Sequence, residues 1–248
     1  MKKFLILQLR PEDEASDNEF EAFLTKGGLT EDEVVRVRIE KEPVPTILPD
    51  QYAGIIIGGG PSNVSDAPEK KTNAQKRFES ELVELFDTIL KYDIPYLGAC
   101  YGIGAIAKYL GASVSKEKYS EDVGATLLKK TGEGMQDQLT RDLPMEFKAL
   151  GGHKEACQEL PKGAVLLLTS DACPVQMFRL KNNVYATQFH PELDTEGILV
   201  RIKVYKHAGY FPPEEADPLA ARCKKEDIHV PEQILRNFVL RYRDKNKA

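Results

Sequence analysis

Residues 94–111 read IPYLGACYGIGAIAKYLG, in which an apolar run leads to Cys100 and an apolar, helix-like run follows it. Gly98 and Gly102 stand two residues before and after the cysteine. This is the form of a G-x-nucleophile-x-G turn, in which small neighbours avoid clashes around a strained residue. A helix that begins just after Cys100 would direct its positive dipole end at the sulfur and favour the thiolate. The alternative is a buried cysteine that simply ends a strand.

Upstream of this turn, candidate strands alternate with candidate helices. We predict strands at 4–9, 34–39, within 52–66 and at 94–99, and helices at 16–28, 69–92 and 102–111. This alternation favours an α/β fold with an open, mostly parallel twisted sheet and helices on both faces.

Beyond residue 112 the pattern changes to short strands separated by turns. The candidates are 113–119, 123–131, 146–152, 164–171, 175–180 and 183–189. They predict a small antiparallel extension, with some strands returning to the main sheet. Helices are predicted at 196–208, 213–226 and 230–245. No linker or repeat interrupts the chain, so we expect one domain over 1–248, with a core of about 1–200 and a helical extension of about 200–248.

Composition excludes several classes of protein. The net charge of -5 is spread without a long one-sign block, which argues against a nucleic-acid binder. The four cysteines form no CxxC pair, so a zinc site is not expected. The short apolar run at 4–9 predicts a core strand rather than a signal peptide, and no run reaches the roughly 20 residues of a membrane span. We expect a cytoplasmic protein with reduced thiols.

A thiol nucleophile needs a base, and ATQFHPELD at 186–194 offers one. If strand geometry continues past Phe189, His190 and Glu192 project to the same side. The carboxylate could then hold one ring nitrogen and turn the other toward the sulfur of Cys100. The alternative is a histidine at a strand end beside a solvated glutamate.

The stretch IIIGGGPS is a candidate oxyanion-binding turn. It places Gly58, Gly59 and Gly60 at the carboxyl end of a central strand, where open parallel sheets bind ligands. Glycine N–H groups can approach an oxyanion closely, and Tyr101 would supply a second N–H. The alternative is a plain Gly-Pro turn. The spacing does not match phosphate-binding or dinucleotide-binding loops.

Taken together, the GGGP turn, G-A-C-Y-G and the later Q-F-H-P-E string resemble a class I glutamine amidotransferase over residues 4–195. Residues 152–192 are similar to the GMP synthetase-like glutaminase branch. The resemblance implies a flavodoxin-like fold in which Cys100 attacks the side-chain amide of glutamine to form a thioester. It also implies that His190 moves the protons and Glu192 orients it. Gly60 (or Gly59) and Tyr101 would hold the oxyanion.

Two positions bear on the substrate. The family usually reads G-x-C-x-G-H-Q, but this chain has Ile103 and Gly104 in the last two places. A polar substrate contact is therefore missing, and Gly104 would leave room for another γ-glutamyl substrate.

His153 matches a family position at the rim of the site, where it could contact substrate or have a structural role. Residues 206–219 could form a lid, a partner-docking arm or a packed C-terminal wrap.

Three functions follow as hypotheses. The first is a glutaminase that hydrolyses glutamine to glutamate and ammonia, with the ammonia passed to an ATP-dependent synthetase or released. The second is a γ-glutamyl peptidase-like hydrolase with the same triad. The third is a non-catalytic binding or regulatory module. No metal or organic cofactor is implied for the glutaminase reaction. The sequence has no SGGVDS-like string, so we expect that this chain does not make GMP alone.

Overall fold

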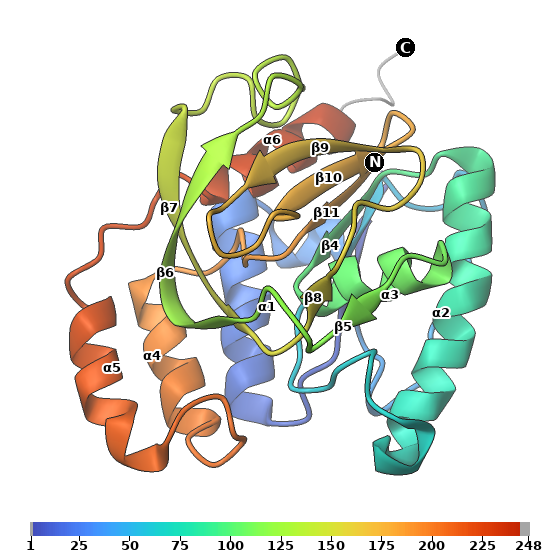
Figure 1. The fold of residues 1–248 in the computed structure, drawn as a ribbon. Coiled ribbons are helices and arrows are strands. Elements are labelled where there is room, and N and C mark those ends of the chain that lie inside the picture. The colour runs from blue at the N-terminus through green and yellow to red at the C-terminus, as the bar shows by residue number, and fades with distance from the viewer. Residues whose placement is uncertain (1, 244–248) are drawn as a thin grey trace.

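The computed structural model describes residues 2–243. Their main feature is a nine-stranded sheet with the order β2-β1-β3-β4-β11-β10-β9-β6-β7 (Figure 1). The strands are β1 (Phe4–Gln8), β2 (Val34–Arg38), β3 (Gly54–Ile57), β4 (Tyr96–Ala99), β6 (Glu121–Lys130), β7 (Glu146–His153), β9 (Ala164–Thr169), β10 (Met177–Leu180) and β11 (Val184–Thr187). A separate two-stranded sheet pairs β5 (Val114–Ser115) with β8 (Ala156–Cys157).

The sheet has a parallel half and an antiparallel half that meet at β11. Strands β2, β1, β3 and β4 run parallel, and β11 joins them by pairing in parallel with β4. On its other side β11 pairs antiparallel with β10, and the antiparallel pairing continues through β9, β6 and β7. The predicted mostly parallel sheet, its antiparallel extension and the return of a late strand to the main sheet are all confirmed.

Helices cover both faces of the sheet, as the alternation predicted. The helices are α1 (Asp13–Gly27), α2 (Asn73–Tyr92), α3 (Tyr101–Tyr109), α4 (Thr195–Val204), α5 (Ala216–Cys223) and α6 (Glu232–Arg243). Alternate residues of β1 serve the two faces, because successive side chains of a strand point in opposite directions. Leu5 and Leu7 belong to the core that α2 and α3 cover, whereas Phe4 and Ile6 belong to the core that α1 and α6 cover.

Several boundaries differ from the sequence-based prediction for local reasons. Residues Pro68–Lys70 form a separate 3-10 turn, and α2 begins later because the Thr72 side chain accepts a hydrogen bond from the Gln75 N–H at 3.1 Å. The strand predicted at 113–119 is only the two residues of β5, and its partner β8 was not predicted. Residues 244–245 of the last predicted helix lie outside the described residues.

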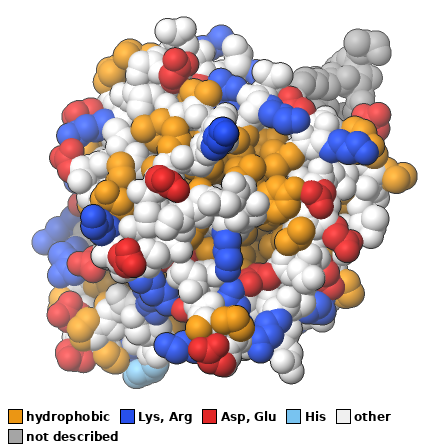
Figure 2. All heavy atoms as spheres, turned by 45° about the vertical axis from the view of Figure 1, so that its right-hand side comes forward, with side chains coloured by type: hydrophobic (Ala, Val, Ile, Leu, Met, Phe, Trp, Pro, Cys, Tyr) orange, Lys and Arg blue, Asp and Glu red, His pale blue; other side chains and the backbone are white. Residues whose placement is uncertain are grey.

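Two surface properties bear on function. On the face in Figure 2, basic and acidic side chains are intermixed with hydrophobic ones, and neither charge gathers into one patch. Among residues 2–243, no helix combines the length and apolar character that a membrane crossing needs.

Candidate active site

Cys100 lies in a strained turn between β4 and α3. Its backbone has φ 52° and ψ -92°, in a region that non-glycine residues rarely adopt. Its N–H donates to the carbonyl oxygen of Thr187 on β11 at 2.8 Å, so the turn is fixed to the neighbouring strand. Backbone strain of this kind persists only where the surroundings impose it, and it concentrates at functional sites.

The glycines around Cys100 are explained by one tyrosine beneath the turn. A Cβ on Gly98 would overlap the hydroxyl of Tyr96, and a Cβ on Gly102 would lie 3.2 Å from the same oxygen. The Tyr96 hydroxyl donates to the Gly102 carbonyl at 3.2 Å. The small residues of the motif therefore admit a buried side chain that supports the turn.

His190 and Glu192 are brought together just after β11. The Nδ1 atom of His190 lies 2.8 Å from Oε1 of Glu192, and the same oxygen accepts a bond from Nη2 of Arg201 at 2.8 Å. Glu192 is fully buried, and Arg201 on α4 is 6% exposed. The carboxylate thus holds the ring by one nitrogen and leaves Nε2 free to face Cys100, with which His190 shares a cavity.

Burial and neighbouring charges set the protonation states. Burial would raise the pKa of Glu192, but His190 and Arg201 outweigh it and hold that pKa well below its usual range. Burial lowers the pKa of His190, and the attraction of Glu192 does not fully offset this effect. Burial raises the pKa of Cys100 to about 12 despite the cations of Arg10 and Arg201. At neutral pH the site therefore holds a thiol beside a neutral imidazole, which can act as its base.

Each residue of the Gly58–Gly60 turn is small for a different reason. A Cβ on Gly58 would lie 2.6 Å from Oε2 of Glu19, one on Gly59 would overlap the His190 ring, and one on Gly60 would lie 2.9 Å from the Leu9 carbonyl oxygen. The N–H of Gly59 donates to Glu19 at 3.3 Å, so it is already engaged. Gly60 lines the cavity with Cys100, so it is better placed than Gly59 to donate an N–H to substrate.

Tyr101 is the first residue of α3, directly after the candidate nucleophile. N–H groups in the first turn of a helix have no acceptor within the helix. The N–H of Tyr101 therefore stays a candidate for the second oxyanion contact.

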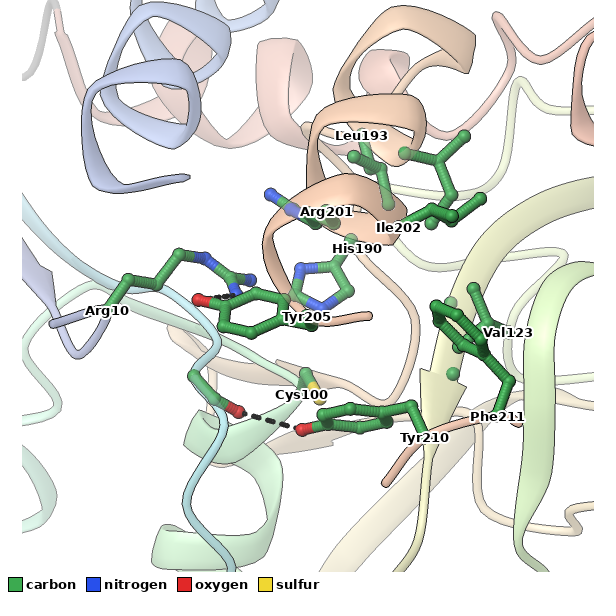
Figure 3. A pocket seen from close by; sticks show the side chains of 14 residues that line it. Arg10, Cys100, Val123, His190, Leu193, Arg201, Ile202, Tyr205, Tyr210 and Phe211 are labelled. Carbon is green, nitrogen blue, oxygen red and sulfur yellow. Dashed lines mark hydrogen bonds between the residues drawn. The ribbon is translucent and has the colours of Figure 1, made fainter. Parts of the chain in front are cut away.

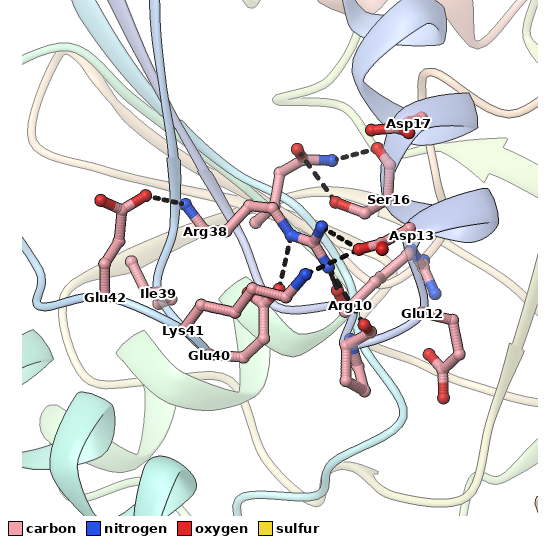
Figure 4. Close-up of polar contacts among 12 residues, drawn as sticks. Arg10, Glu12, Asp13, Ser16, Asp17, Arg38, Ile39, Glu40, Lys41 and Glu42 are labelled. Atoms are coloured by element: carbon pink, nitrogen blue, oxygen red, sulfur yellow. Dashed lines mark hydrogen bonds and ion pairs between the residues drawn. The ribbon is translucent and has the colours of Figure 1, made fainter.

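A second buried ion pair supports the glycine turn. Nε of Arg10 donates to Glu19 at 2.8 Å, and both side chains are almost fully buried. The backbone of Arg10 is held in turn by Arg38, whose Nη2 donates to the Arg10 carbonyl at 2.9 Å (Figure 4). Arg38 also contacts Asp13 and Glu40, so an ionic cluster fixes the loop between β1 and α1.

Cys100 and His190 face a cavity of about 50 Å³ (Figure 3). Residues 205–213, which we call the strap, supply part of its wall through Tyr205, Tyr210 and Phe211. The Tyr210 hydroxyl donates to the Gly60 carbonyl at 3.5 Å, and Nζ of Lys154 lies 4.1 Å from the Tyr210 ring centroid. The first residues of the segment 206–219 thus line the site, and Ala216 and Leu219 further along it pack in a buried cluster.

A second compartment of about 20 Å³ lies on the other side of Tyr210 and also reaches Cys100. Gly104 and His153 line it. Both ring nitrogens of His153 have protein partners, the Glu155 carbonyl oxygen at 2.9 Å and Oε2 of Glu121 at 2.8 Å. These bonds favour a structural role for His153.

The space beside Gly104 is occupied rather than open. A Cβ there would lie 3.2 Å from Cγ2 of Val64 and 3.5 Å from Oε1 of Glu155. The Glu155 carboxylate accepts the N–H groups of Val64 and Ser65 at 2.8 and 2.9 Å. Gly104 therefore accommodates Glu155 instead of widening the cavity by itself.

Two clusters among residues 2–243 contain side chains of metal-ligand type. One is Glu19, His190 and Glu192, and the other is Glu121, His153 and Cys173. Their carboxylates already bond arginine, histidine or amide groups within the protein. These contacts account for the clusters without an ion.

The site and the fold agree with a family comparison. A family model described as glutamine amidotransferase class-I matches residues 16–197. The chain belongs to this family. A glutamine amidotransferase from Thermotoga maritima has the same fold, with a TM-score of 0.76 and 21% identity over 98% of this chain and 99% of that one. A glutamine amidotransferase from Methylobacillus flagellatus has a TM-score of 0.68 and 18% identity over 98% of this chain and 94% of that one.

Some of the relatives that the chain matches are GMP synthases. The chain is 32% identical over 154 residues to GMP synthase (glutamine-hydrolyzing) of Thermosipho africanus, covering 62% of this chain and 26% of that protein. It is 31% identical over 144 residues to a GMP synthase (glutamine-hydrolyzing) subunit of Methanocaldococcus jannaschii, covering 58% of this chain and 66% of that protein. The chain thus spans about a quarter of the length of the first of these relatives and about two thirds of the second. The predicted resemblance to GMP synthetase-like class I amidotransferases is confirmed.

Several residues at the site were not predicted from the sequence. They are Arg10, Glu19, Glu155, Arg201, Tyr205, Tyr210 and Phe211. Arg10 follows β1 at the carboxyl end of the parallel sheet, where ligands bind in such folds, so its position was a usable signal. Tyr210 and Phe211 lie in the segment 206–219 that the sequence analysis singled out, but no local pattern marked them as site residues, because their place depends on how the chain turns back after α4.

Proposed function

We propose that this amidotransferase hydrolyses the γ-amide of glutamine, or of a related γ-glutamyl compound, through a thioester on Cys100. The observation that supports this most directly is the strained Cys100 turn sharing a cavity with a histidine that a buried carboxylate holds by Nδ1. These contacts support the roles of nucleophile, base and orienting group that acyl transfer uses.

In the first half of the reaction, Sγ of Cys100 attacks the amide carbon while Nε2 of His190 takes the thiol proton. The oxyanion that forms would accept the N–H groups of Gly60 and Tyr101. The C–N bond then breaks, and His190 returns its proton to the leaving nitrogen. The products of this half are ammonia and a γ-glutamyl thioester.

In the second half, His190 takes a proton from water as the water attacks the thioester carbon. The C–S bond breaks, glutamate leaves and the thiol is restored with the proton from His190. Throughout, Glu192 stays ionised and stabilises the imidazolium form of His190, and Arg201 holds the carboxylate in place.

The first experiment is intact-protein mass measurement after incubation with a glutamine-mimicking diazoketone. We expect one adduct, absent in Cys100→Ala and suppressed by excess glutamine. An adduct that glutamine does not suppress would favour another γ-glutamyl substrate. Absence of any adduct would contradict a working site in the isolated chain and favour the non-catalytic alternative.

We also propose that the ammonia passes to an ATP-dependent synthetase partner. The support is the similarity to the GMP synthase subunit of Methanocaldococcus jannaschii, which covers about two thirds of that protein. Co-purification followed by glutamine-dependent amination of an acceptor would test it. Glutamine hydrolysis at full rate by the chain alone, with no partner captured, would favour a free-standing hydrolase.

A further inference from the structure

The cavity beside the catalytic pair has an apolar wall that glutamine hydrolysis does not use. Beyond Cys100 and His190, it is lined by Val123, Leu193, Ile198, Ile202 and Phe211 (Figure 3). They come from β6, the segment after β11, α4 and the strap. Three of them, Leu193, Ile198 and Ile202, also pack in one buried cluster, so this wall is a firm part of the fold.

The charged groups that line the same cavity each have an ionic partner, although Nε and Nη1 of Arg201 are buried without a hydrogen-bond partner among residues 2–243. Arg10 bonds Glu19 and the Tyr205 hydroxyl, and Arg201 bonds Glu192. In Figure 3 the guanidinium of Arg201 is turned toward Arg10 and away from Ile202. A ligand atom that extends past His190 therefore meets the apolar wall.

The chemistry determines which part of a substrate lies on this side. In the proposed function, on which this inference rests, His190 must reach the nitrogen of the breaking bond to protonate it. Any substituent on that nitrogen then points to the His190 side of Cys100. The leaving group of glutamine is ammonia, which carries no substituent and leaves the apolar wall without contact.

The compartment on the other side of Tyr210 differs in character. Lys154, Glu155, Asn63 and Gln188 line it. Their charges and dipoles suit the α-amino and α-carboxylate groups of a glutamyl moiety. Cys100 and Tyr210 line both compartments, and the second, at about 20 Å³, is too small for a glutamyl moiety, so the Tyr210 ring has to turn aside to admit one.

We propose that the apolar compartment binds the N-alkyl group of a γ-glutamyl amide, so that the substrates include γ-glutamyl derivatives of small alkylamines. The cavity of about 50 Å³ limits that group. Because one water needs about 10–15 Å³ on the same scale, the cavity holds only a few non-hydrogen atoms. An ethyl or propyl group fits this room, whereas the side chain of a large amino acid exceeds it.

The reaction balances with water as the only other reactant. The C–S bond forms as the amide C–N bond breaks, and the alkylamine leaves with the proton that His190 took from Cys100. Water then hydrolyses the thioester, so the products are glutamate and the alkylamine.

The test measures glutamate release by the full chain from glutamine and its N-methyl, N-ethyl and N-propyl amides. Each buried methylene should raise kcat/KM by about fourfold until the cavity is full. The 2-hydroxyethyl amide, which matches propyl in size but ends in a hydroxyl, should lose most of the gain. Cys100→Ala is the control for background hydrolysis.

A pair of variants on β6 links the effect to the wall. Val123→Ser places a hydroxyl in the cavity and should abolish the rise of kcat/KM with the length of the N-alkyl group. Leu127→Ser, four residues along the same strand at a residue that is 43% exposed, should leave the series as it is.

A flat series with Cys100-dependent release from glutamine would overturn this inference and leave the proposed function standing. An equal change of the series in both serine variants would overturn it in the same way. Absence of Cys100-dependent release from every compound, together with no diazoketone adduct, would overturn both.

Discussion

One carboxylate oxygen of Glu192 joins the candidate base, His190, to Arg201. Oε1 of Glu192 lies 2.8 Å from both Nδ1 of His190 and Nη2 of Arg201. The guanidinium helps keep Glu192 ionised, and its charge opposes protonation of the nearby imidazole. Arg201 thus acts through its neighbours, as a positioning residue that also adjusts the pKa of His190.

We predict that Arg201→Met moves the acid limb of the kcat/KM–pH profile to higher pH. His190 can accept the thiol proton only when neutral, so activity falls as pH drops through its pKa, which lies below its ordinary 6.5. Removing the cation raises that pKa and hence the limb. We also expect kcat to fall by up to about 10²-fold, the low end of an acid–base contribution.

The matched control for this profile is Arg179→Met, because Arg179 pairs with Asp137 at 2.7 Å and does not line the cavity. It should leave the acid limb in place. A loss of activity in Arg201→Met with an unmoved limb would show that Arg201 acts only by holding the structure.

At the scale of single residues, the sequence predicted those site residues that belong to short local motifs. Cys100 stands in a five-residue motif, and His190 and Glu192 alternate after a strand, so both patterns are visible without the fold. The strained φ of Cys100 confirms the predicted turn. Arg201 was missed because it meets the site only after α4 packs beside α1, whereas Arg10 was overlooked although its place after β1 was a usable signal. The catalytic roles remain predictions until activity is measured.

The strap is the element that lines both compartments at Cys100 through Tyr210. Tyr210 stands between the two compartments and is held by Gly60 and Lys154. Burial raises the pKa of the Tyr210 hydroxyl, so this group stays a protonated donor to the Gly60 carbonyl at any physiological pH. Opening the strap must break this bond and uncover the ring.

We predict that Tyr210→Ala increases the rate of diazoketone modification of Cys100 by about three- to tenfold, as expected when a closing element is weakened. The loss of the ring joins the two compartments and exposes the thiol. Tyr92→Ala, at a half-exposed tyrosine on α2, is the control and should leave the rate unchanged. A slower rate in Tyr210→Ala would mean that the ring holds the substrate instead of obstructing it.

Among the elements, strands made of continuous apolar runs were predicted better than two-residue strand pairs. The buried runs of β1, β3 and β4 contain consecutive apolar residues because both sheet faces are covered, and such runs are visible in the sequence. The two-residue strands β5 and β8 carry no periodic signal. Their pairing depends on where the chain after β7 meets the chain after α3.

In the molecule as a whole, buried ionisable groups connect the site to stability. The pKa of Glu192 is lowered in the folded state, so its contribution is present above the ordinary value of 4.5 and is lost as pH falls below it. The pKa of His190 is also lowered, so protonation in the unfolded chain removes stability as pH falls below 6.5. Both residues therefore lower the free energy of unfolding as the pH falls.

We predict that the free energy of unfolding falls as pH drops from neutral, starting near 6.5 and steepening near 4.5, by about 2 kcal/mol or more in total. Urea unfolding at a series of pH values measures this. Glu192→Gln should flatten the lower part of the curve, whereas Glu117→Gln, at an exposed residue, should not. A curve that stays level down to pH 4.5 would contradict the protonation states assigned to the pair.

We propose that the described chain forms one folding unit, as expected from the absence of a linker. The last helix supports this, since Phe238 of α6 contacts Phe4 of β1 with ring centroids 6.3 Å apart. The last helix is thus built into the core that the first strand begins. A truncation before α6 would uncover that core, so it should yield an insoluble or unfolded chain.

The position of β11 has a consequence for biosynthesis. The strand that leads to Cys100 pairs with a strand that emerges from the ribosome more than eighty residues later, with Tyr96 opposite Val184. Until β11 inserts beside β4, the nascent chain carries the cysteine without its histidine, so the thiol has no base. Contacts of such long sequence separation form slowly. A substitution in β9 or β10 that delays this insertion would therefore silence newly made molecules while leaving every residue of the cavity intact.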